Sequence, residues 1–127
     1  MSKSNENNRP MVSVALPVIA APIVLPIMLA GKKLRIRSAK LVQEAVIAAS
    51  GTNFLTYQLK IDNVLKGVAI DTQAGVAVRT ALPLDLGTLG FLDLEKDEYL
   101  SLDVTEDGTF TDGDLAILSL DIEVIGN

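Results

Sequence analysis

The sequence predicts an all-β fold, an antiparallel β-sandwich of jelly-roll-like form with an extended apolar N-terminal arm. Several short runs alternate apolar and polar residues with the period of two that marks a half-buried strand. Gly, Asp and Asn residues gather between these runs, where turns require them. The core is expected to be aliphatic, because 49% of the 127 residues are hydrophobic and only 4% are aromatic.

The chain is expected to divide at residue 22. Residues 1–22 are predicted to form a flexible tail and the extended N-terminal arm, and residues 23–127 a single β-sandwich domain. The apolar stretch from Val12 to Leu29 is too hydrophobic to be left in water on a soluble monomer, so its own domain or a partner is expected to cover it. The residues expected to contact a partner are Val12, Val14, Leu16, Val18, Ile19, Ile23, Leu25 and Ile27.

Residues 11–30 contain no charged residue over twenty positions, which is the length that a membrane-spanning helix needs. Pro17, Pro22 and Pro26 interrupt this stretch, and each Pro inside a helix costs about 3 kcal/mol. A cleaved signal peptide is the second possibility, since basic residues precede the apolar run. The extended conformation is favoured over both, because Pro is tolerated on edge strands and the second half of the stretch alternates with a period of two. No membrane partner is therefore expected.

The alternation that begins at Leu34 slips by one residue near Ser38, which predicts a β-bulge. After the slip, Ala39 and Leu41 are expected to take over the inner face. Residues 39–49 also fit a helix, and periodicity alone does not decide between helix and strand there.

Four later segments alternate more clearly and are predicted to be strands with every second residue facing inward. The last of them is the most regular, and the pattern requires no helix. The four segments are residues 54–61, 76–82, 100–105 and 116–124.

The sequence contains no Cys and no His, which removes thiol nucleophiles, imidazole bases and the usual zinc ligands. No catalytic residue and no cofactor are therefore expected. Residues 41–127 carry fifteen acidic and four basic residues. Nucleic acid is not expected as a partner, because phosphate binding requires a positive surface. Arg35 and Arg37 are expected to lie on the solvent face of a strand.

The segment DVTEDGTFTDGD is dense in acidic residues, and Asp107, Asp112 and Asp114 are its candidate calcium ligands, because carboxylate oxygens bind calcium. The order of the residues does not match an EF-hand loop. An exposed hairpin loop, in which Asp and Gly serve the turn, is favoured over a metal site. Asp121 and Glu123 share a strand face, but a glycosidase site is not favoured, because few aromatic residues exist to line a sugar cleft.

Four segments together resemble the capsid decoration, or cement, proteins of tailed bacteriophages, which are small β-sandwich structural proteins. They are LRIRSAKLV, FLTYQLKID, VAVRTALPLDL and the closing unit LEKDEYLSLDVTEDGTFTDGDLAILSLDIEV. The resemblance implies a virion protein, made in the host cytoplasm, that binds the major capsid protein on the outer capsid surface. It also implies a homo-oligomer, commonly a trimer, that stabilises the shell and has no enzymatic activity.

A rival hypothesis is an exported bacterial β-sandwich module that binds carbohydrate or acts as an adhesin. In that case residues 11–30 would serve as a signal or an anchor.

Overall fold

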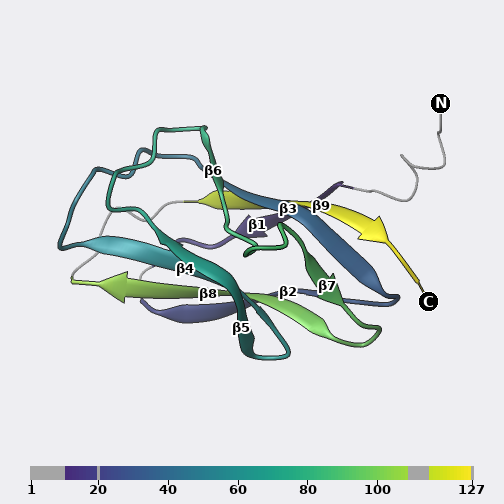
Figure 1. Ribbon diagram of the computed structural model, residues 1–127. Helices are drawn as coiled ribbons and strands as arrows, with labels where there is room; N and C mark the ends of the chain where they lie inside the picture. The colour runs from purple at the N-terminus through teal and green to yellow at the C-terminus, as the bar shows by residue number, and fades with distance from the viewer. Residues whose placement is uncertain (1–10, 20, 109–114, 127) are drawn as a thin grey trace.

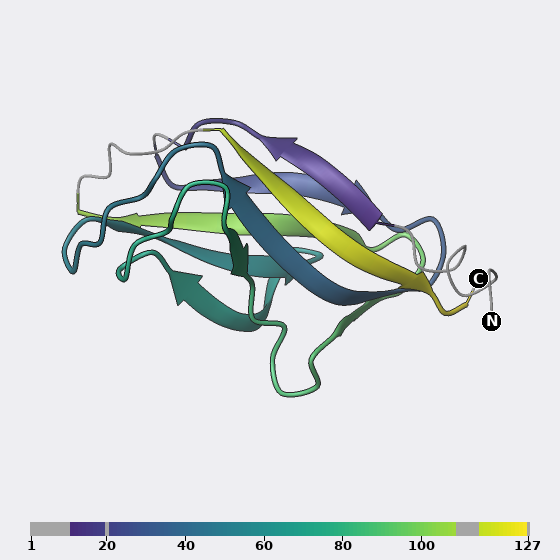
Figure 2. The same cartoon turned by 90° about the horizontal axis from the view of Figure 1, so that it is seen from above.

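The computed structural model describes residues 11–19, 21–108 and 115–126. Within these ranges the chain forms nine strands and no helix. The strands pair in antiparallel fashion into two sheets that lie over one another as two layers (Figures 1 and 2). The predicted all-β sandwich is confirmed.

Each sheet contains strands from both ends of the chain. Sheet A has the order β1 (Met11–Leu16), β9 (Ala116–Val124), β3 (Leu34–Gln43) and β6 (Ala81–Pro83), and β7 (Leu92–Leu94) also pairs with β3. Sheet B has the order β2 (Ile23–Leu29), β8 (Tyr99–Asp107), β4 (Phe54–Ile61) and β5 (Val64–Asp71).

The strand pairs are nested along the sequence. The first strand pairs with the last, β2 pairs with β8, β3 pairs with β6 and β7, and β4 pairs with β5. This arrangement, in which a long antiparallel ribbon is folded over into two sheets, is that of a jelly roll. The jelly-roll-like form expected from the sequence is therefore present.

The core lies between the two sheets and is almost wholly aliphatic. In β4 and β9 the buried residues fall at alternate positions, as the sequence predicted. In β8 Leu100, Leu102 and Val104 are buried as predicted, but Ser101 between them is buried as well, not facing water. The side chains at the centre of this core have no exposed surface; they are Ile36, Leu41, Leu94, Leu100, Leu102, Val104, Leu118 and Leu120.

The β-bulge predicted near Ser38 is confirmed. Ile36 pairs with Ile122 and Ser38 pairs with Asp121, so β3 has one residue more than β9 at this point. The extra residue returns Ala39 and Leu41 to the interior, where both are buried.

The segment 39–49 is strand only as far as Gln43. Beyond it the chain bends, and Ile47 makes an isolated antiparallel bridge with Val76. The helix that remained possible for this segment does not form.

The strand predicted over residues 76–82 is mostly wrong. Val76 makes only its isolated bridge, Val78 is 47% exposed, and regular pairing begins at Ala81. The alternating pattern does not produce a strand here, because Arg79 has a positive φ of 56° that a continuous strand does not accept. The pattern of the sequence does not predict β5 or β7.

The arm predicted over residues 11–22 is extended, but it is not separate from the sandwich. Residues 11–16 are β1, which pairs with β9 at six positions, and residues 23–29 are β2 in the other sheet. The division at residue 22 is corrected accordingly, because alternate residues of β1 face the core. The expected flexible tail, residues 1–10, lies outside the described residues.

The prolines fit the observed path. Pro17 and Pro22 lie in the connection between the two sheets, and Pro26 lies on an edge strand, where a missing N–H is tolerated. None of the described residues belongs to a helix long and apolar enough to span a membrane.

Candidate functional site

The apolar residues expected to contact a partner mostly contribute to the core of their own chain. The assignment to a partner-binding arm is therefore wrong for Leu16, Ile19 and Leu25, which are buried within their own sandwich, and it stays a prediction for the other five residues. Leu16, Ile19 and Leu25 are buried, Val12, Val14 and Ile27 are half-buried against the core, and Val18 and Ile23 remain exposed.

Four strands of sheet A contribute apolar side chains to one straight row on the outer surface. Ala15 of β1 pairs with Ile117 of β9, which pairs with Val42 of β3, which in turn pairs with Ala81 of β6. Directly opposite residues in an antiparallel sheet lie on the same face. Ile117 is 48% exposed between two buried neighbours, so this face points to solvent. We call these four residues the apolar row.

A shallow hollow of about 310 Å³ lies beside the apolar row. Its lining includes Leu115, which is exposed, together with Ala15, Val42 and Ile117 of the row, and Glu44 is the one acidic residue in it. The row and the hollow form a surface that is apolar in its centre, which is typical of a contact site for another macromolecule.

The opposite end of the same outer face is charged. Arg35 donates two hydrogen bonds to the Asp93 carboxylate, at 2.8 and 3.1 Å, and its guanidinium lies 4.0 Å from the centre of the Phe91 ring. The hydrogen bond with Arg35 lowers the pKa of Asp93, and the same bond raises the pKa of Arg35. Arg37 pairs with Glu123 on the neighbouring strand. Both arginines therefore lie on the solvent face, as the sequence predicted.

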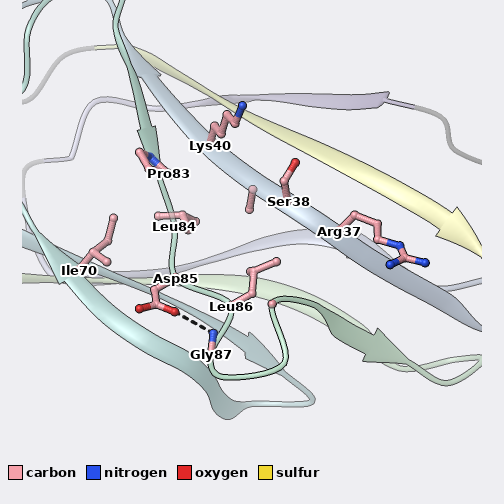
Figure 3. A pocket seen from close by; sticks show the side chains of 11 residues that line it. Arg37, Ser38, Lys40, Ile70, Pro83, Leu84, Asp85, Leu86 and Gly87 are labelled. Carbon is pink, nitrogen blue, oxygen red and sulfur yellow. Dashed lines mark hydrogen bonds between the residues drawn. The ribbon is translucent and has the colours of Figure 1, made fainter.

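A groove of about 460 Å³ lies where β3 meets the connection between β6 and β7 (Figure 3). Its wall is apolar at Pro83, Leu84 and Leu86. Its acidic residue is already used locally, because the Asp85 carboxylate accepts a hydrogen bond of 2.8 Å from the backbone N–H of Gly87. Arg37, which also lines the groove, points away from Asp85 in Figure 3 and pairs with Glu123. The polar groups thus do not converge on one ligand position.

The candidate calcium ligands are not brought together in the described residues. Asp107 is exposed at the end of β8, and Asp112 and Asp114 lie outside the described residues. Across the ranges that the structure describes, no three His, Cys, Asp or Glu residues are grouped in a way that would hold a metal ion. Asp121 and Glu123 are half-buried on the outer face of β9, and Glu123 pairs with Arg37.

The described residues contain one buried tyrosine. The Gln43 side-chain N–H group donates a hydrogen bond of 3.1 Å to the Tyr57 hydroxyl, and Tyr57 is 2% exposed. Burial raises the pKa of Tyr57 to about 12, and the hydrogen bond with Gln43 opposes this rise.

The free energy of unfolding is expected to fall between pH 10 and pH 12 because of Tyr57. Below pH 10 both the folded and the unfolded chain keep the phenol proton, so Tyr57 makes its full contribution to the free energy of unfolding. Above pH 10 the unfolded chain loses this proton first, so stability declines by about 3 kcal/mol until the folded pKa is passed. Urea unfolding of the wild type and of Tyr57→Phe at each pH measures this effect. If the free energy of unfolding fell equally with pH in the two proteins, the effect would not come from Tyr57. Lysine deprotonation in the same pH range affects both proteins equally.

The comparisons with known proteins can now be set beside this geometry. No family model matches the sequence, and no curated protein matches it. One similar solved structure is the EclA C-terminal domain, described as a sugar-binding protein, at 15% identity and a TM-score of 0.44 over 90% of this chain and 79% of that chain.

A second similar solved structure is that of infectious bursal disease virus, Gx strain, at 14% identity and a TM-score of 0.34. The match covers 92% of this chain but 31% of the viral chain. With both TM-scores below 0.5, neither likeness contributes to the functional argument.

Proposed function

We propose that the chain is a non-enzymatic structural protein of a virion, a decoration protein that binds the outer capsid lattice and stabilises the shell. The apolar row is the observation that carries this proposal. The row lies outside the core, and four paired strands hold its side chains in place. The major capsid protein is the proposed partner, and the four segments that resemble cement proteins support this choice.

A sheet surface suits this function for a physical reason. Binding costs free energy when flexible side chains and loops must be ordered at an interface. Ala15 and Ala81 have no side-chain rotamers to lose, and Val42 and Ile117 are β-branched residues with restricted rotamers on paired strands. The apolar row is therefore close to its bound conformation before the partner arrives.

The proposal is tested by sedimenting the purified protein with empty shells assembled from the major capsid protein of the same genome. The wild type is expected to sediment with the shells. Ile117→Asp is expected to lower its affinity by about tenfold or more, because an unpaired carboxylate would be placed in an apolar contact. Val64→Asp is the matched control, since Val64 is an exposed residue of similar shape on the other sheet.

The same proteins distinguish the rival function. No sedimentation with shells, together with binding to a carbohydrate in a glycan screen, would replace the decoration protein with an exported sugar-binding module. Equal loss of shell binding in Ile117→Asp and Val64→Asp would show that the apolar row is not the contact site.

A further inference from the structure

The edge strands of the two sheets are not equally protected against pairing with another chain. Exposed edges carry unpaired N–H and C=O groups, and proteins block them with Pro, Lys, bulges, short strands or covering segments. In β2, Pro26 lies on the edge and the register shifts between Pro26 and Met28. In β5, the Val68 N–H donates to the Asp85 carbonyl at 3.1 Å, and Lys66 lies nearby on the strand. β6 and β7 are three residues long.

Within the described part of the chain, β1 has none of these protections. Its sequence, MVSVAL, contains no Pro and no charged residue, and its pairing with β9 runs without a register shift from Met11 to Leu16. Among the described residues, β9 is its only strand neighbour. No described segment pairs with the other edge of β1, which can therefore accept a further strand.

We propose that β1 of a second copy of this chain completes this edge. The two β1 strands run antiparallel across a two-fold axis at Ser13 and join two copies of sheet A into one continuous sheet. This inference rests on the proposed decoration function and deepens it, because it names a second copy of the chain as a further partner in the assembly.

The inner face of β1 supports this register. Residues directly opposite one another in an antiparallel pair lie on the same face, and the axis at Ser13 places Val12 opposite Val14 of the second copy. Both valines face the interior of their own sandwich, but they are only half-buried because the sandwich is open at this edge. Pairing covers each valine with a valine of the other copy.

The outer face supports the same register. Met11 is 63% exposed, and the axis at Ser13 places it opposite Ala15 of the second copy. Ala15 is the end of the apolar row, so Met11 would extend the row of the neighbouring copy by one apolar side chain. An axis at Val14 would leave Met11 without an opposite residue from the six-residue strand.

The charges on the outer face do not oppose this pairing. Asp121 of β9, opposite Met11, is the nearest acidic residue to the edge in the registered rows. The two copies of β9 would be separated by three interstrand spacings, about 14 Å in total. This separation exceeds the screening length of about 8 Å at physiological salt, so repulsion between the two copies of Asp121 is small.

A two-fold pairing of this kind gives even-numbered assemblies. It differs from the trimer that the resemblance to cement proteins implies, because a trimer requires β1 to contact a different surface of its neighbour. In the paired form both outer faces of sheet A point in the same direction. Two apolar rows would then meet a capsid surface together, which raises the avidity of the pair.

The mass in solution, measured by analytical ultracentrifugation over a range of concentrations, tests the inference on the full chain. The wild type is expected to be a dimer in equilibrium with monomer. Ser13→Lys places two like charges opposite one another on the axis and is expected to raise the dimer dissociation constant by about tenfold or more. Val64→Lys, on the edge strand of sheet B, is the matched control and is expected to leave the dissociation constant unchanged.

The register is tested separately with Ser13→Cys. The natural sequence has no Cys, so any disulfide reports on this position alone. Cα atoms directly opposite one another in an antiparallel pair lie about 4.5–5.5 Å apart, within the range of a disulfide. Mild oxidation is expected to give a covalent dimer of Ser13→Cys but not of Val64→Cys or Thr105→Cys, whose residues are exposed on sheet B.

A monomer at every concentration, a trimer, or equal crosslinking of the three Cys variants would overturn the inference. Shell binding by a protein that fails these tests would leave the decoration function in place and remove only the β1 pairing. Loss of shell binding in a protein that dimerises through Ser13 would leave the β1 pairing in place and remove the decoration function.

Discussion

Replacing Leu118 with Ala is expected to lower the free energy of unfolding by about 3 kcal/mol. Leu118 has no exposed surface and is the third residue of β9, opposite Val14 on one side and Leu41 on the other. Removing its side chain takes away the transfer free energy of three carbon atoms and leaves a cavity that paired strands on both sides cannot close. Urea unfolding followed by circular dichroism measures the change.

The matched control is Ile117→Ala on the adjacent residue of the same strand. Ile117 is on the outer face, so its loss is expected to cost less than about 1 kcal/mol. Equal losses for the two variants would show that β9 does not face the core with the register described above.

Replacing Gly67 with Ala is expected to destabilise the protein by about 3 kcal/mol or more. Gly67 has a φ of +70°, and a Cβ atom added there would lie 2.2 Å from the carbonyl oxygen of Asp85. The obstacle is backbone, so no side-chain rotation relieves it. We expect the segment around Asp85 to separate from β5 and the Val68 N–H to lose its hydrogen bond.

Gly90→Ala separates the cost of the positive φ from the cost of the contact with Asp85. Gly90 also has a positive φ, +77°, but nothing lies within 4 Å of its added Cβ. The free energy of unfolding of this variant is expected to fall by about 1 kcal/mol, which is the cost of the backbone conformation alone. Hydrogen exchange gives the second measurement: the Val68 amide is expected to exchange faster in Gly67→Ala only. Similar stability in the two variants would exclude the close approach of Asp85.

The parts of the fold that were predictable are those in which one strand face is buried and the other is wet. In β4, Leu55, Tyr57 and Leu59 alternate with polar residues, and this local pattern determines which side faces the core. The bulge at Ser38 was predictable for the same reason, because it shifts that pattern by one residue.

Strands without such contrast were missed. β5 is an edge strand with mostly exposed residues on both faces, so VLKGVAID shows no alternation. It forms because β4 offers a partner through the two-residue turn at Asp62 and Asn63, both with positive φ. Conversely, residues 76–80 alternate but find no regular partner, which leaves them irregular.

The candidate site was predictable only in part. Hydrophobicity identified residues 12–27 as needing cover, but it did not show that the sandwich itself covers most of them. The apolar row was not predicted, because Ala15, Val42, Ala81 and Ile117 are far apart in the sequence. Only the register of four strands brings them into one line.

The nesting of the strand pairs also has a consequence for synthesis. Leu16 and Ala116, which pair at the end of β1, are separated by 100 positions in the chain. At a translation rate of about 5–20 residues per second, β1 waits roughly 5–20 s for its partner strand. During that time both edges of an uncharged strand are unpaired on the ribosome. Chaperone binding to nascent chains that end before Ala116 is therefore expected to be stronger than binding to the full-length chain.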